Sequence, residues 1–291
     1  PDRDGREAIL RAHAKGKPLG ADLDLTDVAR KTTGMTGAQL ANALNEAAII
    51  AGRAGREAMA RQDLDEALLR QSVGSQQARR LNQKERRIVA YHEAGHALCR
   101  RLLGLDPPEI LSIVPRGPAL GFVGHSPQED TYLRSREELL DELVTLLGGR
   151  AAEEEVMQAS YSGAVDDLAR VHMVCRQMVA EFGMGVALDA DGAPPIALPT
   201  GDYALSDRTR RDVDVAAMTL AREAYRRARA LLHANRECLD DLAANALERE
   251  TLTREDLDEI FAAHELREKD MPARESLPAG VVLSAEPPAP E

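Results

Sequence analysis

NQKERRIVAYHEAGHALCRRLLG, residues 82–104, is the stretch from which the fold and the chemistry of this chain can be reasoned outward. Asn82 is followed three residues later by Glu85, a spacing typical of a capping box at the start of a helix. Apolar residues then recur at helical spacing, and Gly104 favours an end to the helix. These apolar positions are Ile88, Val89, Ala94, Leu98 and Leu102. The pattern predicts a single, partly buried helix.

Two histidines of this helix stand four positions apart, His92 and His96, and Glu93 directly follows the first. Positions i and i+4 share one helix face, so both imidazoles can reach one metal ion. Zn²⁺ binds neutral imidazole, and a catalytic zinc site has three protein ligands and a water. Glu93 can take the proton of that water as a general base, as in zinc metallopeptidases. Such a motif can arise by chance, but a buried histidine or glutamate without a partner is costly. We therefore predict a zinc site.

The composition is that of a globular chain, with 291 residues, 44% hydrophobic and 30% charged. Aromatic residues are only 3% and tryptophan is absent, so the core must be built from small and aliphatic side chains, which favours helices. The net charge of −12 and the lack of a basic, aromatic-interleaved stripe argue against nucleic acid as a partner.

The cysteines and the hydropathy of the sequence indicate in which kind of cellular compartment the chain is expected. Cys99, Cys175 and Cys238 are widely spaced and odd in number, so we expect buried thiols in a reducing compartment. No apolar run is long enough to span a bilayer, and no secretory signal is recognisable. We expect the chain as given to be soluble.

The chain divides into three regions by pattern. Residues 1–75 predict a small helical bundle, with helices expected over 6–13 and beginning near 25, 36 and 63. The polar stretch 71–81 lacks periodicity and is interpreted as an interdomain linker. Residues 76–266 hold the predicted zinc site, and 267–291 form a Pro/Ala/Glu-rich tail that we expect to be disordered. The fold class is mainly α with a minor β part.

Within the second region, residues 110–114 and 120–125 are strand-like and are separated by a Pro/Gly turn, which predicts a hairpin or edge pair. An extended substrate could pair with the edge of 110–114. Helices are expected elsewhere, over 135–147, 150–157 after Gly148-Gly149, 165–182, 206–233, 235–248 and 253–264, with a loop at 189–203.

The third zinc ligand must come from outside residues 92–96. A carboxylate on a following helix would serve, as in thermolysin-like sites. Glu153, Glu154, Asp166 and Asp167 all qualify, and spacing alone does not choose among them.

Several motifs together resemble the FtsH family of membrane-anchored, ATP-dependent AAA+ zinc metalloproteases. The first is Tyr91 with the His-Glu-Ala-Gly-His-Ala-Leu run. The others are residues 112–117 with 119–121, 148–154, 162–168, 178–184, 207–232 and 250–252. The resemblance covers nearly all of residues 1–265.

The resemblance implies that Asp167 is the third ligand, because it precedes the leucine as in the family's motif. The local sequence departs from that motif, with Asp166 in place of Asn and Val165 in place of Ser. The two aspartates can also simply favour the positive end of a helix dipole. Asp166 and Glu153 are expected beside the ligands, Glu153 orienting a histidine or else lying in solvent as an ordinary helical glutamate.

Residues 1–75 resemble the lid of the family's AAA+ domain. By that resemblance Gly37 and Ala38 lie near the nucleotide in the intact ATPase, although Gly37 is equally explained as a helix-start glycine. No GxxxxGK[ST] phosphate loop occurs in the sequence. ATP and Mg²⁺ are therefore expected only in the intact parent protein, and no ATPase activity is expected from this chain alone.

The implied function is zinc-dependent endoproteolysis of unfolded or membrane proteins by a homo-oligomer, a hexamer in the family. The resemblance implies a bacterial inner membrane, reached through N-terminal segments not in this chain, with this part on the cytoplasmic face. The apolar face of 206–233, formed by Ala217, Leu220, Ala224 and Ala228, is either an intersubunit contact or ordinary core. The alternative function is a catalytically silent oligomeric scaffold of the same fold.

Overall fold

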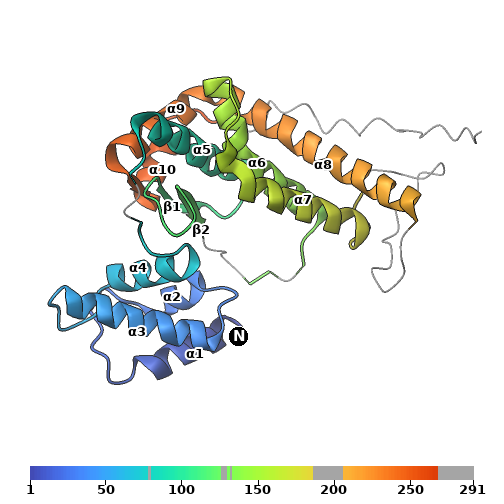
Figure 1. Cartoon of the computed structure of the whole chain (residues 1–291). Coiled ribbons are helices and arrows are strands. Elements are labelled where there is room, and N and C mark those ends of the chain that lie inside the picture. Colours follow the sequence, from blue (N-terminus) through green and yellow to red (C-terminus); the bar gives the residue numbers. More distant parts are fainter. Residues whose placement is uncertain (78–79, 126–129, 132, 186–205, 268–291) are drawn as a thin grey trace, which may run out of the picture. The chain divides into compact units, whose positions relative to one another are not determined.

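The computed structural model describes residues 1–77, 80–125, 130–131, 133–185 and 206–267. Within these ranges the chain has ten α-helices, one 3-10 turn and a three-stranded sheet (Figure 1), which confirms the predicted mainly α fold. The predicted loop at 189–203 and the tail from 268 lie outside the described residues. The chain forms two compact units. One comprises residues 1–133 and 237–265, and the other is built mainly from residues 134–236.

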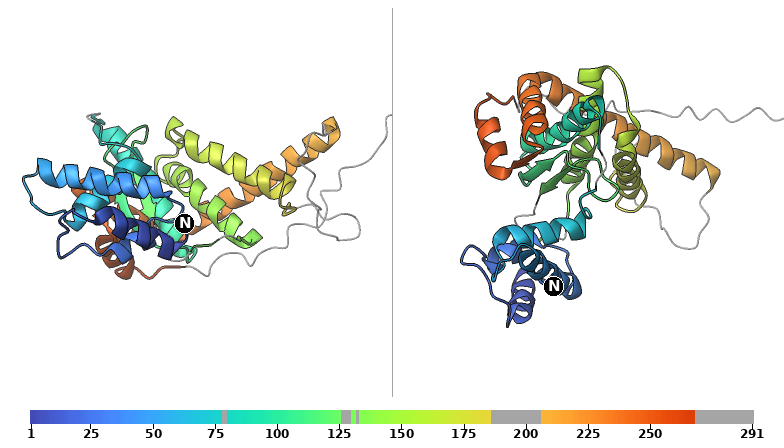
Figure 2. Two further views of the ribbon diagram at one scale, coloured as in Figure 1. Left: turned by 90° about the horizontal axis from the view of Figure 1, so that it is seen from below. Right: turned by 60° about the vertical axis from the view of Figure 1, so that its left-hand side comes forward.

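The first unit begins with a four-helix module. Its helices are α1 (Arg3–Ala14), α2 (Leu25–Lys31), α3 (Gly37–Arg53) and α4 (Arg61–Ser72). Helix α1 packs against α2 and α3, and α3 packs against α4 (Figure 2). The fully buried leucines between them include Leu10, Leu40 and Leu44. The module therefore has a hydrophobic core of its own.

Capping interactions define where two helices of this module begin. Thr36 and Gln39 form a complete capping box at the start of α3, which confirms the prediction there. Helix α4 begins at Arg61, two residues before the predicted Asp63. Asp63 lies inside the first turn, where its carboxylate accepts a hydrogen bond from the Ala60 N–H at 2.9 Å. The acidic residue thus caps the helix from within and does not mark its first residue.

The stretch that follows α4 is hydrogen-bonded to the segment after the first strand. The Gln77 N–H donates to the Pro115 carbonyl at 2.9 Å, and the Gly117 N–H donates to the Ser75 carbonyl at 3.0 Å. Gly117 has a φ of +49°, and a Cβ there would lie 2.6 Å from the Val73 carbonyl oxygen. Only glycine fits this close approach. The polar stretch predicted as a linker is therefore partly held by backbone pairing.

Helix α5 (Gln83–Leu102) confirms the helix predicted from residues 82–104. Asn82 and Glu85 form the expected capping box, and Gly104 follows the helix with a φ of +65°. The buried face of α5 packs on a small antiparallel sheet of strands β1 (Pro108–Ser112), β2 (Phe122–His125) and β3 (Thr251–Thr253). Helices α9 (Arg236–Arg249) and α10 (Arg254–Ala262) complete this part.

The strand order is β2–β1–β3, so β1 is the central strand. The predicted hairpin is confirmed, with Leu111 opposite Val123. The proposal that a substrate pairs with the edge of 110–114 is wrong, because β1 is hydrogen-bonded on both sides. Strand β3, of three residues, was too short to be recognised from sequence.

The second unit is built from three long helices that pack pairwise, α6 (Arg136–Met157), α7 (Val165–Ala180) and α8 (Asp207–Ala234) (Figure 1). The 3-10 turn η1 (Ser162–Ala164) leads directly into α7. Helix α6 continues through Gly148 and Gly149, where two shorter helices had been expected. Both glycines are buried, so tertiary packing offsets their helix-weakening tendency.

The inner face of α8 is ordinary core. Its buried residues include Ala217, Leu220, Ala224 and Ala228, the four that were considered for an intersubunit contact. That interpretation is wrong, because these side chains are covered within the chain itself, on a helix that packs against α6 and α7. In the described ranges, no helix combines the length and apolarity needed to cross a membrane.

Candidate metal centre

The imidazole rings of His92 and His96 converge on the same side of helix α5. Their Nε2 atoms lie 3.0 Å apart, and the ring centroids are 4.6 Å apart with an interplanar angle of 79°. Tetrahedral zinc with bonds of about 2.0–2.1 Å separates two ligand nitrogens by about 3.3 Å. The histidine pair therefore fits one zinc ion with an adjustment of a few tenths of an ångström.

Glu93 lies on a different side of the helix from the two histidines. Consecutive helical residues are about 100° apart. Glu93 consequently shares the buried face with Val89 and Ala97, and it is only 6% exposed. Its side chain lies against Gly121, just before β2, where a Cβ would come within 2.8 Å of Glu93 Oε1. The carboxylate is thus held beside the sheet, one residue from a predicted ligand.

Asp167, the third predicted ligand, belongs with His92 and His96 to a group that could hold a metal ion. Among the described residues, ligand atoms of His92, His96 and Asp167 all lie within 4.8 Å of one another, and all three residues are half-buried. Two imidazoles and a carboxylate are a donor set typical of catalytic zinc. The neighbouring Asp166 is exposed. The donor chemistry and the spacing fit a metal ion.

The two glutamates at the end of α6 bind the turn that precedes α7. Glu153 is 1% exposed and accepts a hydrogen bond from the Tyr161 N–H at 3.3 Å. Glu154 accepts one from Ser160 Oγ at 2.6 Å and another from the Tyr225 hydroxyl. These residues anchor the segment that carries Asp167 in the first turn of α7. Whether Glu153 also orients a ligand histidine stays a prediction.

The charge state of Glu154 follows from these contacts. Burial acts to raise its pKa, but the hydrogen bonds from Ser160 and Tyr225, with the charge of Arg150, lower the pKa overall. Glu154 is therefore an ionised anchor. The sequence grouped Glu154 with the possible ligands because one of its hydroxyl partners, Tyr225 on α8, is distant in the chain.

The two lid residues predicted near a nucleotide are at the start of α3. Gly37 is its first residue, and a Cβ there would meet Ile9 Cδ1 at 3.5 Å, an ordinary contact. A helix-start glycine accounts for this geometry. The nucleotide-proximal role of Gly37 and Ala38 stays a prediction.

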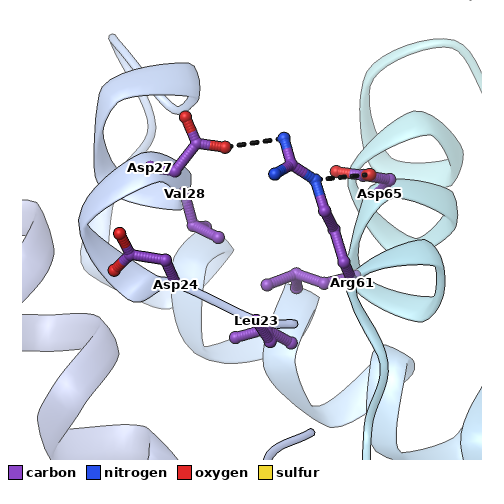
Figure 3. A pocket seen from close by; sticks show the side chains of 7 residues that line it. Leu23, Asp24, Asp27, Val28, Arg61 and Asp65 are labelled. Carbon is purple, nitrogen blue, oxygen red and sulfur yellow. Dashed lines mark hydrogen bonds and ion pairs between the residues drawn. The ribbon is translucent and has the colours of Figure 1, made fainter. Parts of the chain in front are cut away.

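A separate shallow hollow lies on the lid between α2 and α4 (Figure 3). Arg61 bridges it, with Nη2 2.7 Å from Asp27 and Nε 3.6 Å from Asp65. Its lining is Leu23, Asp24, Asp27, Val28, Arg61, Leu64 and Asp65. None of the predicted site residues belongs to it, so the hollow is not the predicted metal centre.

The fold and the donor set define a mainly helical domain with a candidate metal centre, preceded by a small helical module. The sequence model of peptidase family M41 matches residues 79–260, and that of the AAA+ lid domain matches residues 22–66. The chain belongs to peptidase family M41.

Its relatives carry the name ATP-dependent zinc metalloprotease FtsH. The protein of that name from Cutibacterium acnes is 41% identical over 272 residues, 90% of this chain and 38% of the relative. FtsH 2 from Sorangium cellulosum is 43% identical over 283 residues, 91% of this chain and 46% of the relative. FtsH 2 from Symbiobacterium thermophilum is 43% identical over 266 residues, 90% and 45% respectively. The chain thus spans less than half the length of these relatives, and the recognised FtsH resemblance is confirmed.

Proposed function

We propose that this chain is the lid and peptidase portion of an FtsH-type ATP-dependent protease and that it cleaves peptide bonds at a zinc ion held by His92, His96 and Asp167. The observation that carries the proposal is the approach of these three ligand atoms to within 4.8 Å, beside a buried Glu93. The names of the M41 relatives support the choice of zinc and of proteolysis.

The chemistry then divides between the ion and the chain. Zinc bound there supplies Lewis acidity, which brings the pKa of a water ligand to about 7 and polarises the scissile carbonyl. Neutral imidazoles bind through Nε2, the atoms that converge in the structure. Glu93 accepts the proton of the attacking water and later delivers it to the leaving amine. Burial of Glu93 keeps bulk water from competing for that proton.

The substrate is an extended segment of an unfolded or membrane protein. We place it along β2, which is an edge strand of the sheet and begins beside Glu93. Backbone hydrogen bonds to such an edge give affinity with loose sequence preference. Homo-oligomerisation, as a hexamer, and a location at the cytoplasmic face of a bacterial inner membrane are part of the same proposal. ATP and Mg²⁺ act on parts of the parent protein that bear the phosphate loop, a motif absent from this sequence.

Zinc content and digestion of an unfolded protein test the proposal together. Glu93→Gln should retain zinc and lose cleavage by a factor of about 10²–10⁴, because only the proton acceptor is removed. Asp167→Asn should weaken zinc binding, whereas the matched Asp166→Asn should leave it unchanged. Equal zinc loss in both aspartate variants would remove Asp167 from the ligand set. Zinc binding by an assembled oligomer without any cleavage would favour the silent scaffold instead.

A further inference from the structure

Gly121, the residue directly before β2, leaves no room for a side chain. A Cβ at this position would lie 2.7 Å from Val89 Cγ1, 2.8 Å from Glu93 Cγ and 2.8 Å from Glu93 Oε1. Real Cβ atoms essentially never approach a heavy atom closer than 3.0 Å. Any residue other than glycine must therefore displace Val89, Glu93 or the strand itself.

Position 121 requires glycine because a side chain has no space there, and not because of the backbone torsion angles. Gly121 is not among the glycines with positive φ, in contrast to Gly117. Alanine could adopt its backbone conformation without strain. A side chain at position 121 would instead crowd Val89 and Glu93, which are 7% and 6% exposed and lie one turn apart on α5. The interior is close-packed there, so neither neighbour can move without repacking.

We propose that Gly121 is a positioning residue for Glu93. Its missing side chain creates the space that the Glu93 carboxylate occupies, and the backbone before β2 forms the wall that fixes the carboxylate there. This inference rests on the proposed role of Glu93 as general base. A displacement of about 1 Å at a reacting group can lower the rate about 100-fold. Gly121→Ala should therefore lower kcat by about 10- to 100-fold with KM nearly unchanged, and zinc affinity should not change.

The chain offers a matched control in the same strand. A Cβ at Gly124 would lie 2.6 Å from Ile110 Cγ2, on β1, and meets no atom of α5 within 4 Å. Gly124→Ala thus crowds β2 as severely as Gly121→Ala does, but away from Glu93. Gly124→Ala should destabilise the fold comparably, and it serves as the stability control because its Cβ would meet no atom of Glu93.

A double-mutant cycle on stability tests the contact without relying on catalysis. Removing the Glu93 side chain with Glu93→Ala takes away two of the three atoms that crowd a new Cβ. The drop in melting temperature caused by Gly121→Ala should consequently be smaller in the Glu93→Ala background, whereas the drop caused by Gly124→Ala should be equal in both.

The outcomes separate this inference from the proposed function. Additive melting-temperature shifts for Gly121→Ala and Glu93→Ala would overturn the positioning role even if the enzyme is active. An unchanged kcat in Gly121→Ala, corrected for the folded fraction, would overturn it as well. A wild-type chain that binds no zinc and cleaves nothing, but shows the non-additive cycle, would reject the proposed function while the steric fixing of Glu93 stands.

Discussion

Replacing Leu44 by alanine in the middle of α3 should melt the lid module well before α5, the helix that carries His92 and His96. Leu44 is fully buried in a cluster whose members all come from the first 68 residues. Such a truncation costs about 2–5 kcal/mol through lost transfer energy and a residual cavity. A module of this size has a total stability of about 4–10 kcal/mol. At about 4–8 °C per kcal/mol, the melting temperature of the lid should fall by about 8–40 °C.

Differential scanning calorimetry follows the unfolding of the lid module and of the rest of the chain. A fluorescent zinc indicator, read over the same temperatures, reports when the metal centre unfolds. In the Leu44→Ala variant, an early transition should appear without zinc release, and zinc should leave only at the later transition. Ile49→Ala is the control on the same helix, because Ile49 is 47% exposed and its truncation should change stability by about 0.5 kcal/mol or less. A single transition that shifts as a whole and releases zinc would refute the independence of the lid core.

Three further outcomes are expected. Burial, and then the hydrogen bond to Glu154, raise the pKa of Tyr225 to about 12, above the ordinary value of about 10. Because the folded pKa is the higher one, the stabilisation is complete below about pH 10 and is lost as the pH rises through 12. Tyr225→Phe should therefore destabilise by about 1 kcal/mol in urea titrations at pH 8, after allowance for solvent screening, and by less near pH 12; a constant difference would contradict this. Burial raises the pKa of the Cys99 thiol to about 12, so mass spectrometry should find it unalkylated by iodoacetamide at pH 8 until guanidinium is added. Labelling in the native protein would show that this part of α5 opens. Arg116→Met removes the two-pronged pair with Glu66, at 2.8 and 3.2 Å, and should speed amide exchange at residues 115–119; unchanged exchange would mean that the backbone pairing alone holds this turn.

The sequence predicted the local features of this chain well. The N-cap of α5 at Asn82, its capping box with Glu85 and its end before Gly104 all depend on residues in or next to one helix. The spacing of His92 and His96 likewise becomes proximity as soon as the helix forms. Local interactions of this kind need no knowledge of the remaining fold.

Prediction failed where packing overrides local preference. Gly148-Gly149 would weaken an isolated helix, but burial in the three-helix unit keeps α6 continuous. Strand β3 has three residues and exists only because β1 offers it a pairing edge. The apolar face of α8 was ambiguous in sequence, since a buried core face and an interface face have the same periodicity.

The sequence by itself determined that this chain carries two histidines and a glutamate on one helix, because a helix converts spacing into geometry without help. The FtsH resemblance implied Asp167 as a partner of the histidines, but only the tertiary structure decided what surrounds Glu93. Gly121 lies against Glu93 although the two residues belong to different elements, α5 and the segment before β2. Such contacts depend on how helices and strands pack, and no local pattern in the sequence encodes a distance between separate elements.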